Sequence, residues 1–198
     1  MARRAAIVAA TVMGAVLLER PALAADDEGP LAATRAVLVQ SNTIVRGPGD
    51  RKEKLHTLSD LLHGFLDTNA LARVAAAKHL EGRSPEELAE FLGLFHEFFV
   101  RTYVQRLLLF DAPDFVFRGE AVTGDQAEVT TEILTSGDRF AVDYTLRRSD
   151  GAWRATDIAV EGVSLAQNFR AQFDAAVARD SFTGLLERLR AKVAAPAA

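Results

Sequence analysis

Two histidines and one aspartate stand at helical spacing in the first third of the chain. His56, Asp60 and His63 lie at i, i+4 and i+7, which places all three on one face of a helix. Imidazole nitrogens and a carboxylate are ligands that zinc accepts. The apolar residues of the same stretch fall on the opposite face, namely Leu58, Leu61, Leu62 and Phe65. We therefore predict a solvated polar face without a metal site, and surface positions for His79 and His96, which lack a partner pattern.

A second possible chemistry is proton transfer by carboxylates and a phenol. Curved sheets backed by helices, as in NTF2-like enzymes, often hold such groups, and the candidates here are Asp143, Asp157 and Tyr144. Asp143 is predicted on a polar strand face, and Asp157 is expected to pair with Arg139 or Arg154. No histidine or further carboxylate is placed to complete a relay, and no esterase, zinc-protease or kinase motif occurs. The pattern predicts no catalytic site.

Composition excludes several other classes of protein. The 198 residues include no cysteine, which rules out a disulfide framework, a thiolate metal site and a lipoprotein anchor cysteine. A net charge of −4 gives no basic excess for nucleic-acid binding. A phosphate-binding loop motif is absent, and no cofactor is predicted. With 49% hydrophobic residues, the chain can build a sizeable core in one domain.

The N-terminus has the three parts of a cleaved secretory signal. Arg3 and Arg4 precede an apolar run over residues 5–18, and Ala22 and Ala24 supply small residues before a cleavage point. We predict a signal peptide over residues 1–24, cleaved after Ala24, and export of the mature protein. Residues 25–193 are predicted to form one domain, and residues 194–198 a disordered tail.

Apolar residues recur with helical period in the first half of the chain and alternate in the second half. The pattern predicts helices over residues 31–45, 50–65, 68–79 and 84–110, strands over 115–122, 127–135, 139–148 and 152–160, and helices that begin at Ser164 and Ser181. In the last strand Trp153 and Ala155 fall on one face and Ile158 and Val160 on the other, which predicts cover on both faces. The predicted fold class is α+β, with a four-stranded antiparallel curved sheet (NTF2-like) packed with N- and C-terminal helices around an apolar pocket.

The helix over 84–110 and the sheet carry more apolar residues than one contact face needs. The surplus comprises Phe98, Phe99, Tyr103 and residues 107–110 on the helix, and Phe117, Val129, Ile133, Phe140, Val142 and Tyr144 on the strands. The pattern alone fits both a close-packed core and a partly open cavity for an apolar ligand.

The stretch after the last strand resembles the signature of the MlaC family. It reads Val160-Glu161-Gly162-Val163-Ser164-Leu165, then Asn168-Phe169-Arg170 and Gln172-Phe173. Upstream segments agree, namely Ser84-Pro85-Glu86-Glu87, Phe95 with Phe98, Arg101-Thr102-Tyr103, Val142-Asp143-Tyr144 and Asp150-Gly151-Ala152-Trp153 with Asp157. The likeness covers about residues 31 to 192. The chain departs from the family at Leu66, where Phe is common, at residues 76–79, where Gly-x-x-Trp is common, and at Phe169, where Tyr is common.

The resemblance implies a periplasmic phospholipid-binding protein, also known as a toluene-tolerance or ABC-transporter auxiliary component. Such a carrier moves phospholipid between outer- and inner-membrane complexes and serves the lipid asymmetry of the outer membrane. The expected partners are phospholipid, an inner-membrane ABC lipid-transport complex and an outer-membrane lipoprotein complex, with no nucleic acid and a monomeric carrier. The hopanoid-associated HpnM branch shares the signature, so another lipid is an alternative.

On this hypothesis the acyl chains lie between the sheet and the helix over 84–110. The expected lipid-binding residues are Phe98, Phe99, Tyr103, Phe117, Val129, Phe140, Val142 and Tyr144. Arg118, Arg139 and Arg147 are candidates for a docking surface around the pocket mouth. Two alternatives stay open: an NTF2-like enzyme acting on a small hydrophobic substrate, with Asp143 or Asp157 as the base, and an adaptor that carries nothing.

Overall fold

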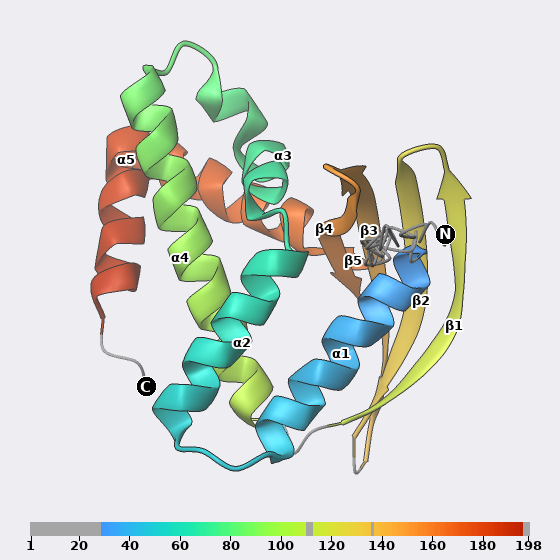
Figure 1. Ribbon diagram of the computed structural model, residues 1–198. Coiled ribbons are helices and arrows are strands. Elements are labelled where there is room, and N and C mark those ends of the chain that lie inside the picture. Colours follow the sequence, from blue (N-terminus) through green and yellow to red (C-terminus); the bar gives the residue numbers. More distant parts are fainter. Residues whose placement is uncertain (1–28, 110–112, 136, 196–198) are drawn as a thin grey trace, which may run out of the picture.

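Four helices precede the sheet and one long helix follows it in the computed structural model, which describes residues 29–109, 113–135 and 137–195 (Figure 1). The predicted signal peptide lies outside these residues. The helices are α1 (Pro30–Arg46), α2 (Arg51–Phe65), α3 (Thr68–Leu80), α4 (Pro85–Leu109) and α5 (Leu165–Ala194). The strands are β1 (Asp114–Thr123), β2 (Gln126–Leu134), β3 (Arg139–Ser149), β4 (Ala152–Val160) and β5 (Val163–Ser164).

Side-chain caps fix where several helices begin. The Asp50 carboxylate accepts from the Glu53 amide at 2.9 Å, while the Glu53 side chain accepts from the Asp50 amide, and this capping box starts α2. The Ser84 hydroxyl accepts from the Glu87 amide at 3.1 Å before α4. The Ser164 hydroxyl caps α5 in the same way. Each cap satisfies an amide that would otherwise lack a partner, so the predicted starts at Ser84 and Ser164 are confirmed.

The long last helix contains a break at Ser181, where φ is 68° and ψ is 175°. This backbone conformation is rare outside glycine, so it interrupts the helix and turns the chain. The two C-terminal helices predicted from the sequence are the two arms of α5 on either side of this kink. Helix α5 ends at Ala194, which is the first residue of the predicted tail.

The five strands form one antiparallel sheet in the order β1-β2-β3-β4-β5. Asp150 and Gly151 both have positive φ, 53° and 80°, as the tight turn between β3 and β4 requires. The predicted α+β class and antiparallel sheet are confirmed. The sequence predicted four strands and missed β5, which has only two residues and is too short to show alternation.

The residues of β4 that share one face of the sheet differ from those predicted. Leu146 pairs with Ala155 whereas Thr145 pairs with Asp157, so one extra residue of β4 bulges out of the ladder. A bulge reverses the alternation beyond it. Ala155 and Ile158, opposite Leu146 and Tyr144, therefore lie on the same face, and the prediction that β4 is covered on both faces was wrong.

The helices gather on one face of the curved sheet (Figure 1). Helix α1 contacts β1 and β2, α5 contacts β4, and α2 lies between α1 and α4. Helices α3, α4 and α5 pack against one another, and α3 and α5 also contact β4. Within residues 29–109, 113–135 and 137–195, none of the helices has the length and apolar character needed to cross a bilayer.

Candidate functional site

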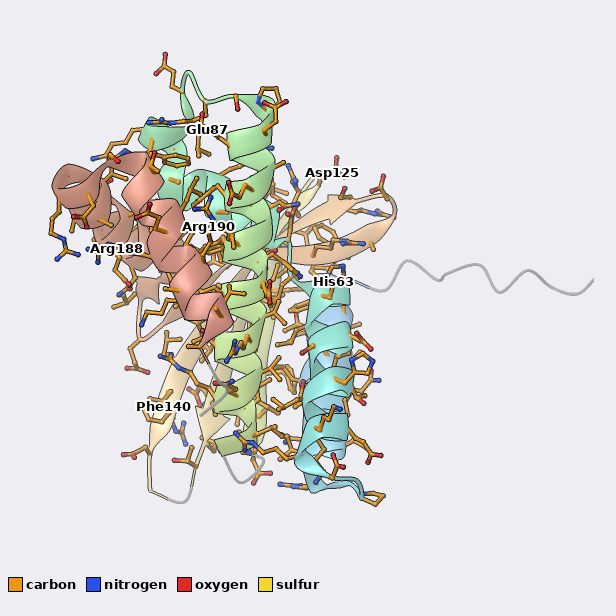
Figure 2. All side chains as sticks on the ribbon, turned by 90° about the vertical axis from the view of Figure 1, so that its left-hand side faces the viewer. His63, Glu87, Asp125, Phe140, Arg188 and Arg190 are labelled. Atoms are coloured by element: carbon orange, nitrogen blue, oxygen red, sulfur yellow. The ribbon has the colours of Figure 1, made fainter. Side chains whose placement is uncertain are left out.

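A cavity of about 340 Å³ remains between the sheet and helices α1, α2 and α4. We call its buried end the floor, formed by Leu38, Ser41, Leu62, Phe65, Leu66, Phe99, Val142 and Tyr144. Its half-buried and exposed end, which we call the rim, consists of Arg106, Leu107, Pro113, Thr135, Phe140 and Val160. Figure 2 shows Phe140 at the lower end of the sheet, where α4 also finishes. The lining is therefore apolar at depth and carries its charge at the outer end.

The bulge in β4 completes the lining on the sheet side. It turns Ile158 and Val160 toward the helices, beside Tyr144 and Val142 of the neighbouring strand. All four side chains line the cavity. Without the extra residue, the alternation of β4 would direct Ile158 and Val160 to the outer face of the sheet.

The polar groups of the floor are occupied by the protein itself. The Tyr144 phenol is buried next to Thr131, and burial raises its pKa, so the hydroxyl stays neutral. The Thr131 hydroxyl donates to the Val142 carbonyl at 2.9 Å, and the Ser41 hydroxyl donates to the Val37 carbonyl at 2.8 Å. Among the described residues, every buried side-chain nitrogen and oxygen has a hydrogen-bond partner. The floor can therefore solvate an apolar chain, but it offers no ionised base.

Five of the eight predicted lipid-binding residues line the cavity. Phe99 and Tyr103 come from α4, where their rings stack with centroids 4.4 Å apart. Phe140, Val142 and Tyr144 alternate along β3 on the face toward the helices. Burial also raises the pKa of the Tyr103 phenol, with the Arg106 cation acting in the opposite direction. The structure brings these five together, and their contact with a lipid remains a prediction.

The other three predicted residues lie elsewhere. The Phe98 ring meets Phe169 of α5 edge to face, with centroids 6.1 Å apart. Phe117 lies under the Arg35 guanidinium, whose central carbon is 3.9 Å from the ring centroid. Val129 is fully buried in the core and does not reach the cavity surface. Their residue types match those of the lining, but their neighbours differ.

Sequence reasoning missed the contribution of the first two helices. Leu38 of α1 and Leu62, Phe65 and Leu66 at the end of α2 line the cavity. Helical periodicity did place Leu62 and Phe65 on one apolar face, but periodicity does not tell which surface covers that face. Arg106 was also missed, although it stands one turn after Tyr103 on the same helix.

The two candidate catalytic carboxylates do not line the cavity. Asp157 accepts from the amides of Ile158 and Ala166, at 2.8 and 3.1 Å, and from the Ser164 hydroxyl. These hydrogen bonds join the start of α5 to β4. The sequence predicted a pair of Asp157 with Arg139 or Arg154 instead. Asp143 lies on the other face of β3 from Val142 and Tyr144.

The histidine predictions need correction in part. His56 and Asp60 are exposed at 80% and 70%, and no group of three metal-ligating side chains occurs among the described residues. His79, however, is only 13% exposed and bonds Asp174 at 2.7 Å. His96 lies between the His63 ring nitrogen at 3.0 Å and the Thr68 hydroxyl at 2.7 Å. The structure places His79 and His96 in half-buried positions instead of free on the surface, because their partners come from distant segments.

The arginines predicted for docking are held in ion pairs. Arg118 and Arg139 both contact the Glu132 carboxylate, at 2.7 and 2.9 Å, and the hydrogen bond from Arg118 lowers the pKa of Glu132 most. Arg147 contacts Asp67 at 3.1 Å. These pairs connect strands to one another and β3 to the start of α3, and a docking role for them remains a prediction.

Comparison with known proteins bears on the whole domain. The family model described as MlaC protein matches residues 33–191. The chain belongs to the MlaC family. Among curated relatives, the toluene tolerance protein ttg2D of Pseudomonas putida is 25% identical over 126 residues, which cover 62% of this chain and 59% of that protein. The resemblance seen in the signature around Val160–Phe173 is confirmed.

A solved structure has the same fold as this chain. The phospholipid-binding protein from Ralstonia solanacearum, determined in complex with a phospholipid, has a TM-score of 0.72 to it. The match covers 83% of this chain and 97% of that one, at 19% sequence identity. At this identity the match shows the shared arrangement of helices and curved sheet.

Proposed function

We propose that this MlaC-family protein is a lipid carrier that holds acyl chains in the cavity and moves lipid through the periplasm. The observation that carries the proposal is the apolar cavity of about 340 Å³ beneath the sheet. Family membership and the phospholipid bound to the Ralstonia solanacearum protein of the same fold support the same ligand class.

The size of the cavity favours a bound ligand over an empty space. Apolar side chains that surround an unfilled space lose packing contacts, and the cost in free energy grows with the volume left empty. Water is a poor occupant because each buried molecule needs two to four polar partners, and the buried side chains of the lining offer only the hydroxyls of Ser41 and Tyr144. An apolar ligand removes this cost.

The transport step follows from the insolubility of lipids. Two acyl chains of about 30 methylenes exposed to water cost on the order of 20 kcal/mol, at about 0.8 kcal/mol each. A carrier lowers this barrier because the chains exchange one apolar surrounding for another. No bond is made or broken, so we assign the protein no enzymatic activity.

The proposed carrier acts in one cellular compartment and with membrane partners. The signal-like residues 1–24 support export to the periplasm and cleavage after Ala24. We propose transient docking of a monomer to an inner-membrane ABC lipid-transport complex and to an outer-membrane lipoprotein complex. Docking must be transient because a shuttle that binds tightly cannot leave.

Native mass spectrometry of the protein purified from a bacterial periplasm tests the binding step. We expect a mass above that of the polypeptide that begins at Ala25, and we expect lipid in the organic extract. A bare polypeptide mass, together with no uptake of lipid from liposomes, would contradict the proposal. The measured excess mass also gives the number of acyl chains bound and separates phospholipid from hopanoid.

Transfer between membranes tests the carrier role separately. Donor and acceptor vesicles held apart should exchange labelled phospholipid faster when the protein is present, and crosslinking in cells should capture membrane complexes of both kinds. Stable self-association on light scattering, or lipid binding without any transfer, would contradict the shuttle.

A further inference from the structure

Charge is distributed unevenly around the cavity. Of the residues that line it, Arg106 alone carries a charged side chain, and it lies at the exposed rim. The remaining lining is aliphatic and aromatic apart from the hydroxyls of Ser41, Thr135, Tyr103 and Tyr144. A ligand that fills the floor with acyl chains therefore meets a single cation where its polar end emerges.

The position of the Arg106 side chain is set by a column of aromatic rings on α4. Phe99 is fully buried, and Tyr103 stacks on it with centroids 4.4 Å apart. The Arg106 guanidinium carbon lies 5.3 Å from the centroid of the Tyr103 ring. The column thus runs from the floor to solvent along one helix face, and the ring orients the guanidinium at the rim.

The guanidinium has no carboxylate partner among the residues that the structure describes. Other arginines of the chain differ in this respect: Arg139 contacts Glu132, Arg147 contacts Asp67 and Arg188 contacts Asp180. Arg106 is thus left with donors for an external anion. A guanidinium presents these donors in a planar fork that matches the oxygens of a phosphate.

We propose that Arg106 binds the phosphodiester of a lipid whose acyl chains occupy the cavity, and so makes the protein selective for phosphate-bearing lipids over uncharged ones. The inference rests on the proposed function, since it assigns the headgroup of the same ligand. It favours a phospholipid over an uncharged polycyclic lipid as cargo.

The test is competitive loading. Wild-type protein freed of lipid is incubated with vesicles that contain equal amounts of phosphatidylglycerol and a diacylglycerol with the same acyl chains, and bound lipid is quantified by mass spectrometry. We expect wild type to prefer phosphatidylglycerol, and Arg106→Gln to lower that preference about five- to tenfold while diacylglycerol uptake is kept. Arg106→Lys, which keeps the charge and loses the fork, should give an intermediate ratio.

Arg35→Gln is the matched control. It removes an exposed arginine that also lies over an aromatic ring, Phe117, but lies outside the cavity lining. Its lipid ratio should equal that of wild type. An unchanged ratio in Arg106→Gln, or an equal fall in Arg35→Gln, would overturn the inference. If wild type takes up neither lipid, the proposed function itself fails.

Two further readouts separate other roles of Arg106. A cation in the last turn of α4 also stabilises the helix end, so thermal unfolding of each variant is measured. A lower melting temperature with an unchanged lipid ratio would show a structural role only and overturn the inference. Thermal stabilisation of lipid-free wild type, but not Arg106→Gln, by inorganic phosphate, again with an unchanged lipid ratio, would assign the site to free phosphate instead.

Discussion

Helix α4 passes through two regions of different packing. In its first half Phe91 and Phe95 contact Phe169, Phe173 and Phe182 of α5, with ring centroids 5.2–5.8 Å apart. We call this the closed region. In its second half Tyr103 and Leu107 face the sheet across the cavity, the open region. Both halves carry similar apolar side chains, so residue type does not decide which half is filled.

The partner surface makes the difference. In the closed region a second helix presents aromatic rings that interlock with those of α4, and edge-to-face contacts fill the space. In the open region the partner is a curved sheet, from which the straight helices α1, α2 and α4 cannot be equally distant along its whole length (Figure 1). A cavity therefore forms where a straight helix and a curved sheet diverge and their side chains cannot fill the space between them. Removing or adding side-chain volume should therefore change stability more in the closed region than in the open region.

The largest effect is expected from Phe95→Ala in the closed region. Phe95 is fully buried among four other rings, and its removal should lower the free energy of unfolding by about 3–5 kcal/mol. Phe140→Ala at the rim of the open region should cost less than about 1 kcal/mol, because that side chain is only half-buried. Urea unfolding of lipid-free protein measures both. Equal losses would show that the two regions are packed alike.

Substitution by tryptophan should have different effects at two valines on neighbouring strands, Val129 and Val142. Val129→Trp places a large ring in filled core and should lower the free energy of unfolding by about 1–3 kcal/mol without changing lipid occupancy per folded molecule. Val142→Trp points its ring into the cavity, so the fold should be kept while lipid occupancy falls. Urea unfolding and native mass spectrometry give the two quantities. If Val142→Trp is severely destabilised and its occupancy is unchanged, that valine belongs to ordinary core.

A smaller, stabilising effect is expected at the kink of α5 in the closed region. Ser181 holds a positive φ of 68° that glycine adopts freely, and its hydroxyl makes only a 3.5 Å contact with the Gly184 amide. Ser181→Gly should raise the free energy of unfolding by about 1 kcal/mol through relief of backbone strain. Lipid occupancy should stay at the wild-type level, since the residue is remote from the cavity lining. A loss of stability would mean that the hydroxyl cap outweighs the strain.

The smallest effect concerns the contact of α2 with α4 at the border of the two regions. Burial, and next the nearby His63, lower the pKa of His96, so the folded protein binds its proton less readily than the unfolded chain. The stabilising contribution is therefore complete above the unfolded pKa of about 6.5 and is lost as pH falls through that value toward the lower folded pKa. Figure 2 shows His63 near the end of α2.

The change that tests this contact is His96→Gln. The variant should show a smaller loss of stability than wild type when the pH is lowered from 7.5 to 5.5, as measured by urea unfolding at each pH. His56→Gln, which removes an exposed imidazole on α2, is measured alongside it as the control for the loss of a histidine as such. Identical pH profiles for wild type and His96→Gln would contradict the linkage.

Much of the fold could be predicted from short stretches of sequence. The caps at Ser84 and Ser164 and the turn at Asp150-Gly151 involve groups within three residues of one another, so their free energies are local. Regular alternation along β3 predicts its inward face, which includes Phe140, Val142 and Tyr144. These three residues are the part of the candidate site that could be predicted in this way.

Other features depended on pairing and could not be predicted. The bulge in β4 exists only relative to β3, where Thr145 and Leu146 set the register, and it moves Ile158 and Val160 to the cavity face. His96 meets His63 and Thr68 only after three helices have packed. Such contacts join residues that no local pattern connects.

The sequence by itself determined the α+β class, the helix starts, the inward face of β3 and the family, because these depend on periodicity, caps and a signature of neighbouring residues. Only the tertiary structure decided that Val142 lines a cavity while Val129 fills core, and that Arg106 stands at its rim. The physical reason is that an apolar sequence pattern predicts only which side chains are removed from water. Whether space remains beside it depends on how well the shapes of distant elements fit.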